Sequence, residues 1–176
     1  MVKKPTVHLK FKKKLFVKKK MSWQRRIKID LEDLKKANFE ILPESGEDLA
    51  LDCFRVVLHG PKDTPYADAC WQVRFTIQPT FPFSSPSVGF IEKIMHPNID
   101  WTSGSVCLDA LNKKWSPAFT LRHIMEALLP YLLSYPNPED PLNREAAQLL
   151  VEDKNIYVMK VQENSRKYSF RPLGSV

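Results

Sequence analysis

The chain has 176 residues, 43% of them hydrophobic, and a formal net charge of +7 at pH 7. This length suits one domain of ordinary size, and no run of about 18 uninterrupted apolar residues or apolar secretory signal is present. The three cysteines include no C-x-x-C pair, which argues against a disulfide framework and a zinc site. A reducing compartment, cytoplasm or nucleus, is therefore expected.

Most of the positive charge lies in the first 20 residues, which contain nine lysines and no acidic residue. The remaining 156 residues carry 18 basic and 20 acidic groups, a net charge of −2. We expect residues 1–21 to form a basic, disordered arm, residues 22–170 to form the folded domain, and residues 171–176 to form a short tail. A solvated, weakly structured arm without a specific role is the expectation, and contacts with nucleic acid, an anionic membrane or a nuclear importer are the alternatives. Met21 is an alternative start, which would leave the arm out of the cellular protein.

Residues 22–38 have the pattern of an amphipathic helix, with Ser22 as a suitable N-cap. The apolar stripe contains Trp23, Ile27, Leu31 and Leu34. The opposite face is basic and contains Arg25, Arg26, Lys28, Lys35 and Lys36. A solvated face is the simple interpretation of these charges, and a docking surface is the alternative.

Four strand-like runs follow, at Phe39–Leu42, Leu49–Leu58, Cys70–Ile77 and Ser87–Ile91. The second and third runs alternate apolar and polar residues, as half-buried strands do. Short links containing Pro and Gly join the runs, which predicts an antiparallel meander. Cys53 and Cys70 lie within these runs, where each is expected to be a small core residue.

Residues 92–119 show no periodic pattern, and an irregular segment of that length inside a domain usually has a functional reason. Helical patterns return at Thr120–Leu133, Arg144–Val151 and Asp153–Tyr168. Thr120 and Asn143 are the expected N-caps, and Pro130 should kink or locally open the first of these helices. Strands grouped before helices predict an α+β domain rather than alternating βαβ units.

The irregular segment contains the candidate nucleophile, Cys107. Its neighbours include no group that would strongly depress the pKa of the thiol, so protease-like Cys–His chemistry is weakly supported, although His96 or His123 could approach in space. A cysteine that receives an acyl group already activated as a thioester needs less help. Exchange between two thiols is nearly balanced in free energy, and the enzyme mainly has to position the reactants and exclude water.

The tripeptide His96-Pro97-Asn98 precedes this cysteine. The side-chain N–H₂ of Asn98 can stabilise a tetrahedral oxyanion, or it can tie down the loop, and the spacing supports both roles equally. His96 is expected to be a packed, hydrogen-bonded structural residue rather than a base.

Six stretches in family order resemble the ubiquitin-conjugating enzymes: GPKDTPYADACW, FPFSSPSVGF, HPNID, GSVCLD, WSPAFTL and YPNPEDPLN. The resemblance covers about residues 22–168. The distance from HPN to Cys107 and the Leu-Pro before YPNP are similar to the H branch of that family. The resemblance implies a Ubc-type α+β fold with an N-terminal helix, a four-stranded antiparallel meander, an irregular active-site loop and C-terminal helices. It implies no cofactor and no metal.

The resemblance also implies a relay. Cys107 would accept the C-terminus of ubiquitin from an activating enzyme as a thioester and pass it to a lysine of a protein substrate, with a ubiquitin ligase bound. Asn98 would stabilise the oxyanion or hold its loop, with His96 in support. Asp140 would orient the lysine amine and help it lose a proton, although capping the turn before Pro141 is an alternative role. Asp109 would join this acidic approach, or remain a solvated loop carboxylate.

Partner surfaces follow from the same resemblance. The expected ligase contacts are Phe83, Ser116, Pro117 and Ala118, and the expected activating-enzyme contacts are Arg25, Arg26 and Lys28. Phe83 lies between turn prolines, where an aromatic residue is either an exposed anchor or a core residue. In the H branch, the expected ligase is a multisubunit complex related to the C-terminal-to-LisH complex.

Three features depart from the family pattern. A Gly-rich link is replaced by Ala67-Asp68-Ala69, the acidic tail of the H branch is absent, and the basic arm is not a general family feature. These departures leave branch-specific partners open. The alternative functions are a carrier for another ubiquitin-like modifier, a non-catalytic ubiquitin-binding variant, and a nucleic-acid or membrane-binding protein driven by the arm. The nearly neutral domain itself gives no reason to expect nucleic-acid binding.

Overall fold

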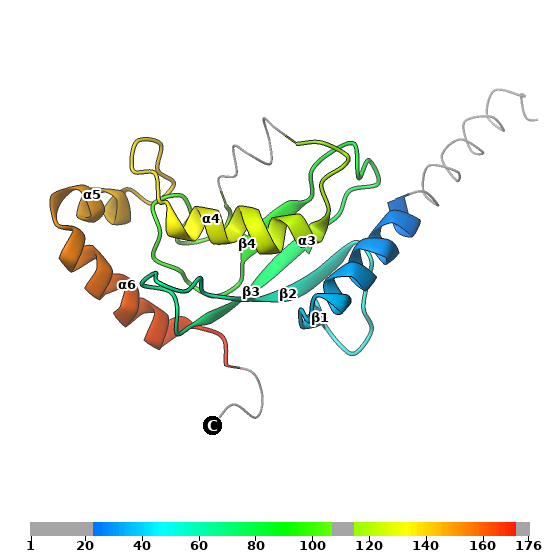
Figure 1. Ribbon diagram of the computed structural model, residues 1–176, viewed down its shortest axis with the longest axis horizontal. Coiled ribbons are helices and arrows are strands. Elements are labelled where there is room, and N and C mark those ends of the chain that lie inside the picture. Colours follow the sequence, from blue (N-terminus) through cyan, green and yellow to red (C-terminus); the bar gives the residue numbers. More distant parts are fainter. Residues whose placement is uncertain (1–22, 107–114, 172–176) are drawn as a thin grey trace, which may run out of the picture.

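The computed structural model describes residues 23–106 and 115–171 (Figure 1). A helix over residues 23–36 precedes a four-stranded sheet with the order β1-β2-β3-β4. The strands are β1 (Ile41–Pro43), β2 (Cys53–His59), β3 (Cys70–Thr76) and β4 (Ser87–Phe90), and every neighbouring pair is antiparallel. The helices that follow are α3 (Leu121–His123), η1 (Ile124–Leu128), α4 (Leu129–Ser134), α5 (Arg144–Glu152) and α6 (Lys154–Tyr168). The predicted α+β class and antiparallel meander are confirmed.

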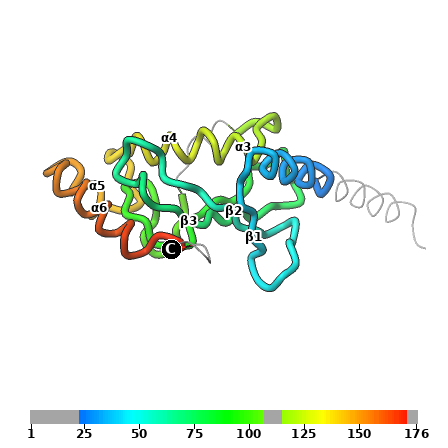
Figure 2. Tube along the Cα trace, turned by 60° about the horizontal axis from the view of Figure 1, so that its bottom comes forward, coloured from blue at the N-terminus to red at the C-terminus, as the bar shows by residue number. Residues whose placement is uncertain are grey.

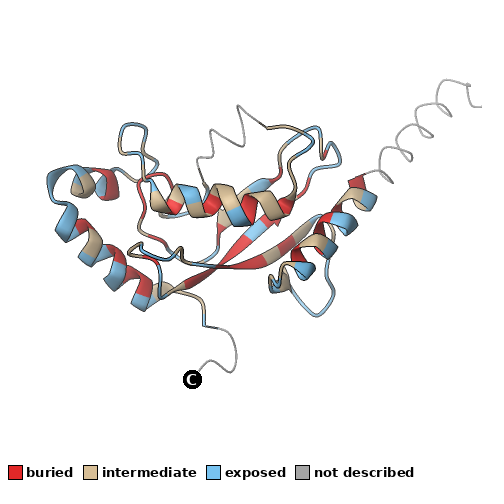
Figure 3. Ribbon diagram, viewed as in Figure 1, coloured by how far each residue is buried: buried red, intermediate tan, exposed pale blue. Residues whose placement is uncertain are grey.

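The helices cover the sheet unequally. The continuous helix formed by α3, η1 and α4 lies across one face of the sheet, as two views show (Figures 1 and 2). The helix over residues 23–36 lies at one end of the molecule, and α5 and α6 lie at the other (Figure 1). Each of these helices contains buried residues (Figure 3), and these residues join the buried residues of the strands in one hydrophobic core.

Alternation along β2 and β3 directs one set of side chains into this core. Opposite residues in the register are Phe54 with Phe75, Val56 with Val73, and Leu58 with Trp71, and all six are buried. The Phe54 and Phe75 rings stack with their centroids 5.6 Å apart. Cross-strand aromatic and β-branched pairs of this kind stabilise a sheet and set its register.

Two of the predicted strands begin too early, and all four end within one residue of the predicted position. β2 begins at Cys53 rather than Leu49, because residues 45–52 form a loop in which Gly46 has a φ of 70° and Leu49 is 37% exposed. β1 begins at Ile41 rather than Phe39, since the helix ends in a turn where Asn38 has a φ of 63°. Apolar residues in these two segments gave a strand-like sequence pattern, but the segments have no partner strand to pair with among the described residues.

The helix over residues 23–36 buries the predicted apolar stripe. Trp23, Ile27, Leu31 and Leu34 are all at most 5% exposed. The predicted N-cap, Ser22, lies outside the described residues.

The helix from Leu121 to Ser134 begins as predicted and contains a π-helical turn. The hydroxyl of Thr120 accepts a hydrogen bond from the N–H of His123 at 3.1 Å and caps the helix. Pro130 has no N–H to continue the ordinary ladder, and the N–H of Leu129 bonds the carbonyl of Ile124, five residues back. The expectation that Pro130 locally opens this helix is confirmed.

The last two helices begin at side-chain caps. The Asn143 side chain accepts from the N–H of Ala146 at 3.1 Å, and Asp153 accepts from the N–H groups of Asn155 and Ile156. None of the helices in the described parts of the chain is long and apolar enough to cross a membrane. Residues 23–106 and 115–171 also contain no cluster of three or more His, Cys, Asp or Glu side chains suited to a metal ion.

Candidate active site

Cys107 and Asp109 lie outside the described residues, but the segment that leads to Cys107 is described up to Val106. Val106 forms an antiparallel bridge with Ile99, and Ser105 forms one with Gly89 of β4. Asp100 stabilises the turn between Ile99 and Val106, because its Oδ1 accepts a hydrogen bond from the N–H of Ser103 at 2.7 Å. The chain is therefore held against the sheet until the residue before the candidate nucleophile.

His96 has no exposed surface. Its Nδ1 accepts from the N–H of Asn98 at 3.0 Å, so the ring proton is on Nε2, which donates to the carbonyl of Leu132 at 3.0 Å. Burial lowers the pKa of His96 from 6.5 to about 4. Both ring nitrogens are occupied and the ring is neutral at pH 7, which is the arrangement of a structural histidine.

The side chain of Asn98 is buried and makes three hydrogen bonds to the backbone of residues 137–140. Its Nδ2 donates to the carbonyl of Asn137 at 2.7 Å and to that of Asp140 at 3.2 Å. Its Oδ1 accepts from the N–H of Asn137 at 2.8 Å. Both amide hydrogens and the side-chain oxygen of Asn98 therefore bind the loop at residues 137–140.

The neighbouring carbonyl of Pro97 completes this contact. It accepts from the N–H groups of Leu142 and Asn143, at 2.8 and 2.9 Å. We call the contact between residues 96–98 and residues 137–143 the Asn98 clamp. It brings together two predicted site residues, Asn98 and Asp140, while the side chain of Asp140 remains exposed.

Sequence reasoning missed Asn137, the main partner of Asn98. Asn137 lies between Pro136 and Pro138, which have no N–H, so it carries the one backbone donor of that tripeptide. Its side chain also accepts from the N–H of Glu139 at 3.0 Å. The proline-Asn-proline spacing was a signal for this role, because only Asn137 can donate from that stretch of backbone.

The residues predicted to contact a ligase form one surface. Phe83 is 72% exposed, so its alternative role in the core is wrong. Pro117 and Ala118 are exposed and Ser116 is half-buried. The indole N–H of Trp115 donates to the carbonyl of Pro82 at 2.7 Å, which joins the two segments.

The three basic residues of the first helix do not share one environment. Arg25 and Lys28 are exposed, whereas Arg26 is half-buried and turns its guanidinium onto the loop at Pro117 and Phe119. The guanidinium of Arg26 is therefore less open to a partner than the side chains of Arg25 and Lys28. The reason is that two backbone carbonyls of this loop lie within its reach.

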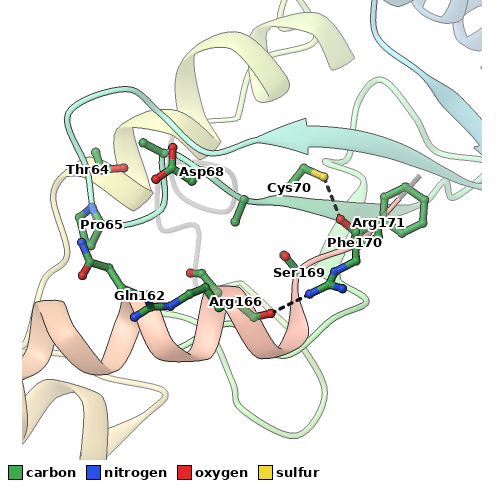
Figure 4. Close-up of a pocket in the computed structure, with 12 residues that line it drawn as sticks. Thr64, Pro65, Asp68, Cys70, Gln162, Arg166, Ser169, Phe170 and Arg171 are labelled. Carbon is green, nitrogen blue, oxygen red and sulfur yellow. Dashed lines mark hydrogen bonds between the residues drawn. The ribbon is translucent and has the colours of Figure 1, made fainter. Parts of the chain in front are cut away.

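The other two cysteines, Cys53 and Cys70, lie within the described residues and differ from each other in burial. Cys70 lines a groove between the segment at Thr64–Ala69 and the end of α6, and its thiol donates to the carbonyl of Phe170 at 3.1 Å (Figure 4). Burial raises the pKa of the Cys70 thiol. Cys53 is half-buried. Cys70 is thus the small buried residue that was predicted, whereas the same prediction for Cys53 is wrong, because Cys53 is only half-buried.

Comparison with known proteins agrees with this architecture. The sequence model of a family described as ubiquitin-conjugating enzyme matches residues 22–165. "Ubiquitin-conjugating enzyme E2-23 kDa" of Triticum aestivum is 53% identical over 116 residues, 66% of this chain and 63% of that protein. "Ubiquitin-conjugating enzyme E2-24 kDa" of Saccharomyces cerevisiae is 43% identical over 151 residues, 84% of this chain and 66% of that protein.

The fold is also similar to solved structures. The E2 domain of a Toxoplasma gondii ubiquitin-conjugating enzyme superposes with a TM-score of 0.76 at 28% identity, covering 84% of this chain and 99% of that one. The chain spans about two thirds of the length of the curated relatives it matches. Family match, relatives and fold agree, and this chain belongs to the ubiquitin-conjugating enzyme family.

Proposed function

We propose that this protein is a ubiquitin-conjugating enzyme whose Cys107 carries ubiquitin as a thioester. The observation that carries the proposal is the family match over residues 22–165, which includes Cys107. The structure supports it by anchoring the chain at Val106 and by holding Asp140 on the loop of the Asn98 clamp.

The first step is a thioester exchange. The thiolate of Cys107 attacks the carbonyl of ubiquitin's C-terminal thioester on the activating enzyme, and the bond to that enzyme's sulfur breaks. The exchange replaces one thioester by another, so the step needs positioning more than base catalysis. This agrees with the surroundings of His96, which has no free ring nitrogen to act as a base.

The second step forms an isopeptide bond. The amine of a substrate lysine attacks the thioester carbonyl, the carbon–sulfur bond to Cys107 breaks, and the amine loses a proton. The exposed carboxylate of Asp140 is the group that orients the amine and assists the loss of that proton. Asp109, two residues after Cys107, adds negative charge to the same approach.

Asn98 acts in this second step mainly by holding the loop that carries Asp140. The three hydrogen bonds of its side chain support this role. To meet an oxyanion, Asn98 would have to release one of its two backbone acceptors, and the bond to Asp140, at 3.2 Å, is the longer of the two. The oxyanion role is therefore secondary here.

Partners follow from the same assignment. The ligase surface contains Phe83, Ser116, Pro117 and Ala118 together with the basic face of the first helix. The activating enzyme competes with the ligase for this surface and docks on the helix at Arg25 and Lys28, on either side of Arg26. The motif spacing of the H branch supports a multisubunit ligase related to the C-terminal-to-LisH complex. The cysteine usage supports action in the cytoplasm or the nucleus.

A charging assay with activating enzyme, ATP and ubiquitin tests the proposal. The expected product runs as an adduct on a non-reducing gel and is removed by thiol. Cys107→Ala should form no adduct, and Cys107→Ser or Cys107→Lys should form one that resists thiol. Cys53→Ala is the matched control and should charge normally. A thiol-sensitive adduct on Cys107→Ala would disprove the assignment of Cys107. If the protein is charged only with another ubiquitin-like modifier, by the activating enzyme of that modifier, the protein is a carrier for that modifier instead of ubiquitin.

A further inference from the structure

Arg26 joins three segments of the chain through one side chain. Its Nη1 donates to the carbonyl of Pro117 at 2.8 Å, and its Nη2 donates to the carbonyl of Phe119 at 2.6 Å. Its Cζ lies 5.6 Å from the centre of the Phe81 ring. The first helix is therefore linked to the loop at 115–119 and to the turn that presents Phe83.

Asp30 fixes the orientation of this guanidinium. It lies one helical turn after Arg26, and its Oδ1 accepts from Nε of Arg26 at 3.0 Å. The Asp30 side chain is only 2% exposed, and a buried carboxylate is tolerated when it is paired with a cation. With Nε directed at Asp30, the planar fork of the guanidinium aims its two outer nitrogens at the two loop carbonyls.

The other hydrogen bonds of the loop are mostly internal to it. The N–H of Phe119 bonds the carbonyl of Ser116 at 2.9 Å, and the N–H of Ala118 bonds the hydroxyl of Ser116 at 3.3 Å. Trp115 bonds outward to Pro82 at the start of the loop. Arg26 supplies the outward contacts at the other end, at Pro117 and Phe119.

The basic helix face and this loop form a single surface. Arg25 and Lys28 are exposed on the helix on either side of Arg26 in sequence, and Pro117 and Ala118 are exposed on the loop. The contacts of Arg26 and Asp30 link these two parts. They lie outside the Asn98 clamp, which joins residues 96–98 to residues 137–143.

We propose that Arg26 and Asp30 are a positioning pair that sets the loop at 115–119 against the first helix, so that the activating enzyme reads helix and loop as one docking surface. This inference rests on the proposed function. Arg26 acts through the loop, not through its own contact with the partner. When the pair is broken, the loop adopts its docking conformation in a smaller fraction of molecules. The apparent affinity for the activating enzyme falls in proportion to that fraction.

Three variants of the full chain test the pair. Asp30→Asn removes the carboxylate charge at nearly constant volume, and Arg26→Lys keeps the positive charge but loses the two-pronged fork. Glu32→Gln is the matched control, an exposed acid-to-amide change on the same helix. Thermal unfolding of each variant establishes that it is folded, and Arg26→Lys decides the matter if Asp30→Asn does not fold.

The first measurement is amide hydrogen exchange at Ala118 and Phe119, which needs no enzyme activity. Both pair variants should exchange faster there by on the order of tenfold, and Glu32→Gln should match the parent. Unchanged exchange in both pair variants would overturn the inference.

The second measurement is the rate of charging at increasing concentrations of ubiquitin-loaded activating enzyme. The expected result in both pair variants is a KM raised on the order of tenfold with kcat retained. A loss of kcat alone, as general destabilisation would give, or a normal KM in Asp30→Asn would overturn the inference. If the parent chain is not charged at all, the proposed function fails, whereas hydrogen exchange still tests the hold on the loop.

Discussion

Burial determines what the polar residues near Cys107 can do. His96 and Asn98 are fully or almost fully buried, and the polar atoms of both side chains form hydrogen bonds with backbone groups. A buried polar group that lost such partners would bear a large desolvation cost. These side chains therefore stabilise the frame of the site, while the exposed carboxylate of Asp140 is free to meet a substrate.

His96 predicts a specific dependence of stability on pH. Its pKa is 6.5 in the unfolded chain and about 4 in the folded one, so the unfolded chain binds the proton more readily. The His96 contribution is constant above pH 6.5, and the free energy of unfolding falls as the pH drops from 6.5 to about 4. The total loss is about 3 kcal/mol.

Urea unfolding at a series of pH values measures this loss. His96→Gln should be less stable at pH 7 but should lose less stability than the parent on acidification. His59→Gln, the same substitution at an exposed histidine, is the control variant. Equal slopes for the parent and His96→Gln would contradict the prediction.

Asn98→Ala tests whether Asn98 holds the loop. The change leaves the N–H of Asn137 and the carbonyls of Asn137 and Asp140 without their partner, so it should lower the free energy of unfolding by about 1–3 kcal/mol. Charging should stay near normal, and discharge to lysine should slow because Asp140 is less well positioned.

Asn137→Ala is the control for this change, since it keeps the backbone groups that Asn98 binds and removes only the bond to Glu139. It should cost much less than Asn98→Ala. Slow discharge of Asn98→Ala at full stability would instead favour a direct role at the oxyanion.

At the scale of elements, caps and turns set where each segment begins. Thr120, Asn143 and Asp153 each accept a hydrogen bond from a free N–H of the first turn that follows. The π-helical turn has a different origin, because Pro130 interrupts the ladder and the helix widens by one residue. Its core-facing residues Ile124 and Leu129 stay buried on both sides of that change.

The cap at Asn143 lies beside the Asn98 clamp and should be measurable on its own. Asn143→Ala removes the acceptor for the N–H of Ala146 and should lower the free energy of unfolding by about 1 kcal/mol. Asn143→Asp should restore most of it. Asn155→Ala, at an exposed position inside α6, is the control and should have a smaller effect, so equal losses in both alanine variants would refute the capping role.

Substitutions at two glycines with positive φ allow the cost of steric overlap to be distinguished from the cost of backbone strain. Gly104, in the turn before Cys107, has a φ of 69°, and an added Cβ would lie 1.9 Å from the carbonyl oxygen of Phe90. Gly46 has a φ of 70° but nothing within 4 Å of that position. Gly46→Ala should therefore cost only about 1 kcal/mol, whereas Gly104→Ala must displace the Ser105–Gly89 bridge.

Denaturant unfolding and the charging assay should separate the two glycine variants. Gly104→Ala is expected to cost at least about 2 kcal/mol more than Gly46→Ala and to charge poorly. Equal costs would show that strain alone matters at both positions.

At the scale of the whole molecule, charge is unevenly distributed. The first 20 residues contribute +9 and the remaining residues −2. The Asn98 clamp and the proposed docking surface both lie within residues 23–171. Binding to polyanions and charging with ubiquitin should therefore be separable properties of this chain.

Removing residues 1–20 should abolish salt-dependent retention on heparin at neutral pH, since the remaining chain has a net charge of −2. Charging of Cys107 should persist at a similar rate. Retention that survives the deletion would place the basic surface within the domain, and loss of charging would give the arm a role in the relay.

The sequence by itself determined most of the fold. Period-two alternation predicted β3 and the core of β2, the apolar stripe predicted the first helix, and Thr120 and Asn143 predicted where two helices begin. These signals are local, because a strand or a helix repeats within a few residues. These local signals failed at Leu49–Asp52. Leu49 and Leu51 are apolar, but the register of β2 with β3 begins only at Cys53.

Only the tertiary structure decided how the side chains of the site are used. Asn98 bonds a loop 39 residues away, and Arg26 bonds one 91 residues away. The sequence allowed Asn98 to face an oxyanion or a loop, and it placed Arg26 on the solvent face of its helix. Which atoms come within hydrogen-bonding distance depends on how irregular loops pack, and no local periodicity encodes that packing.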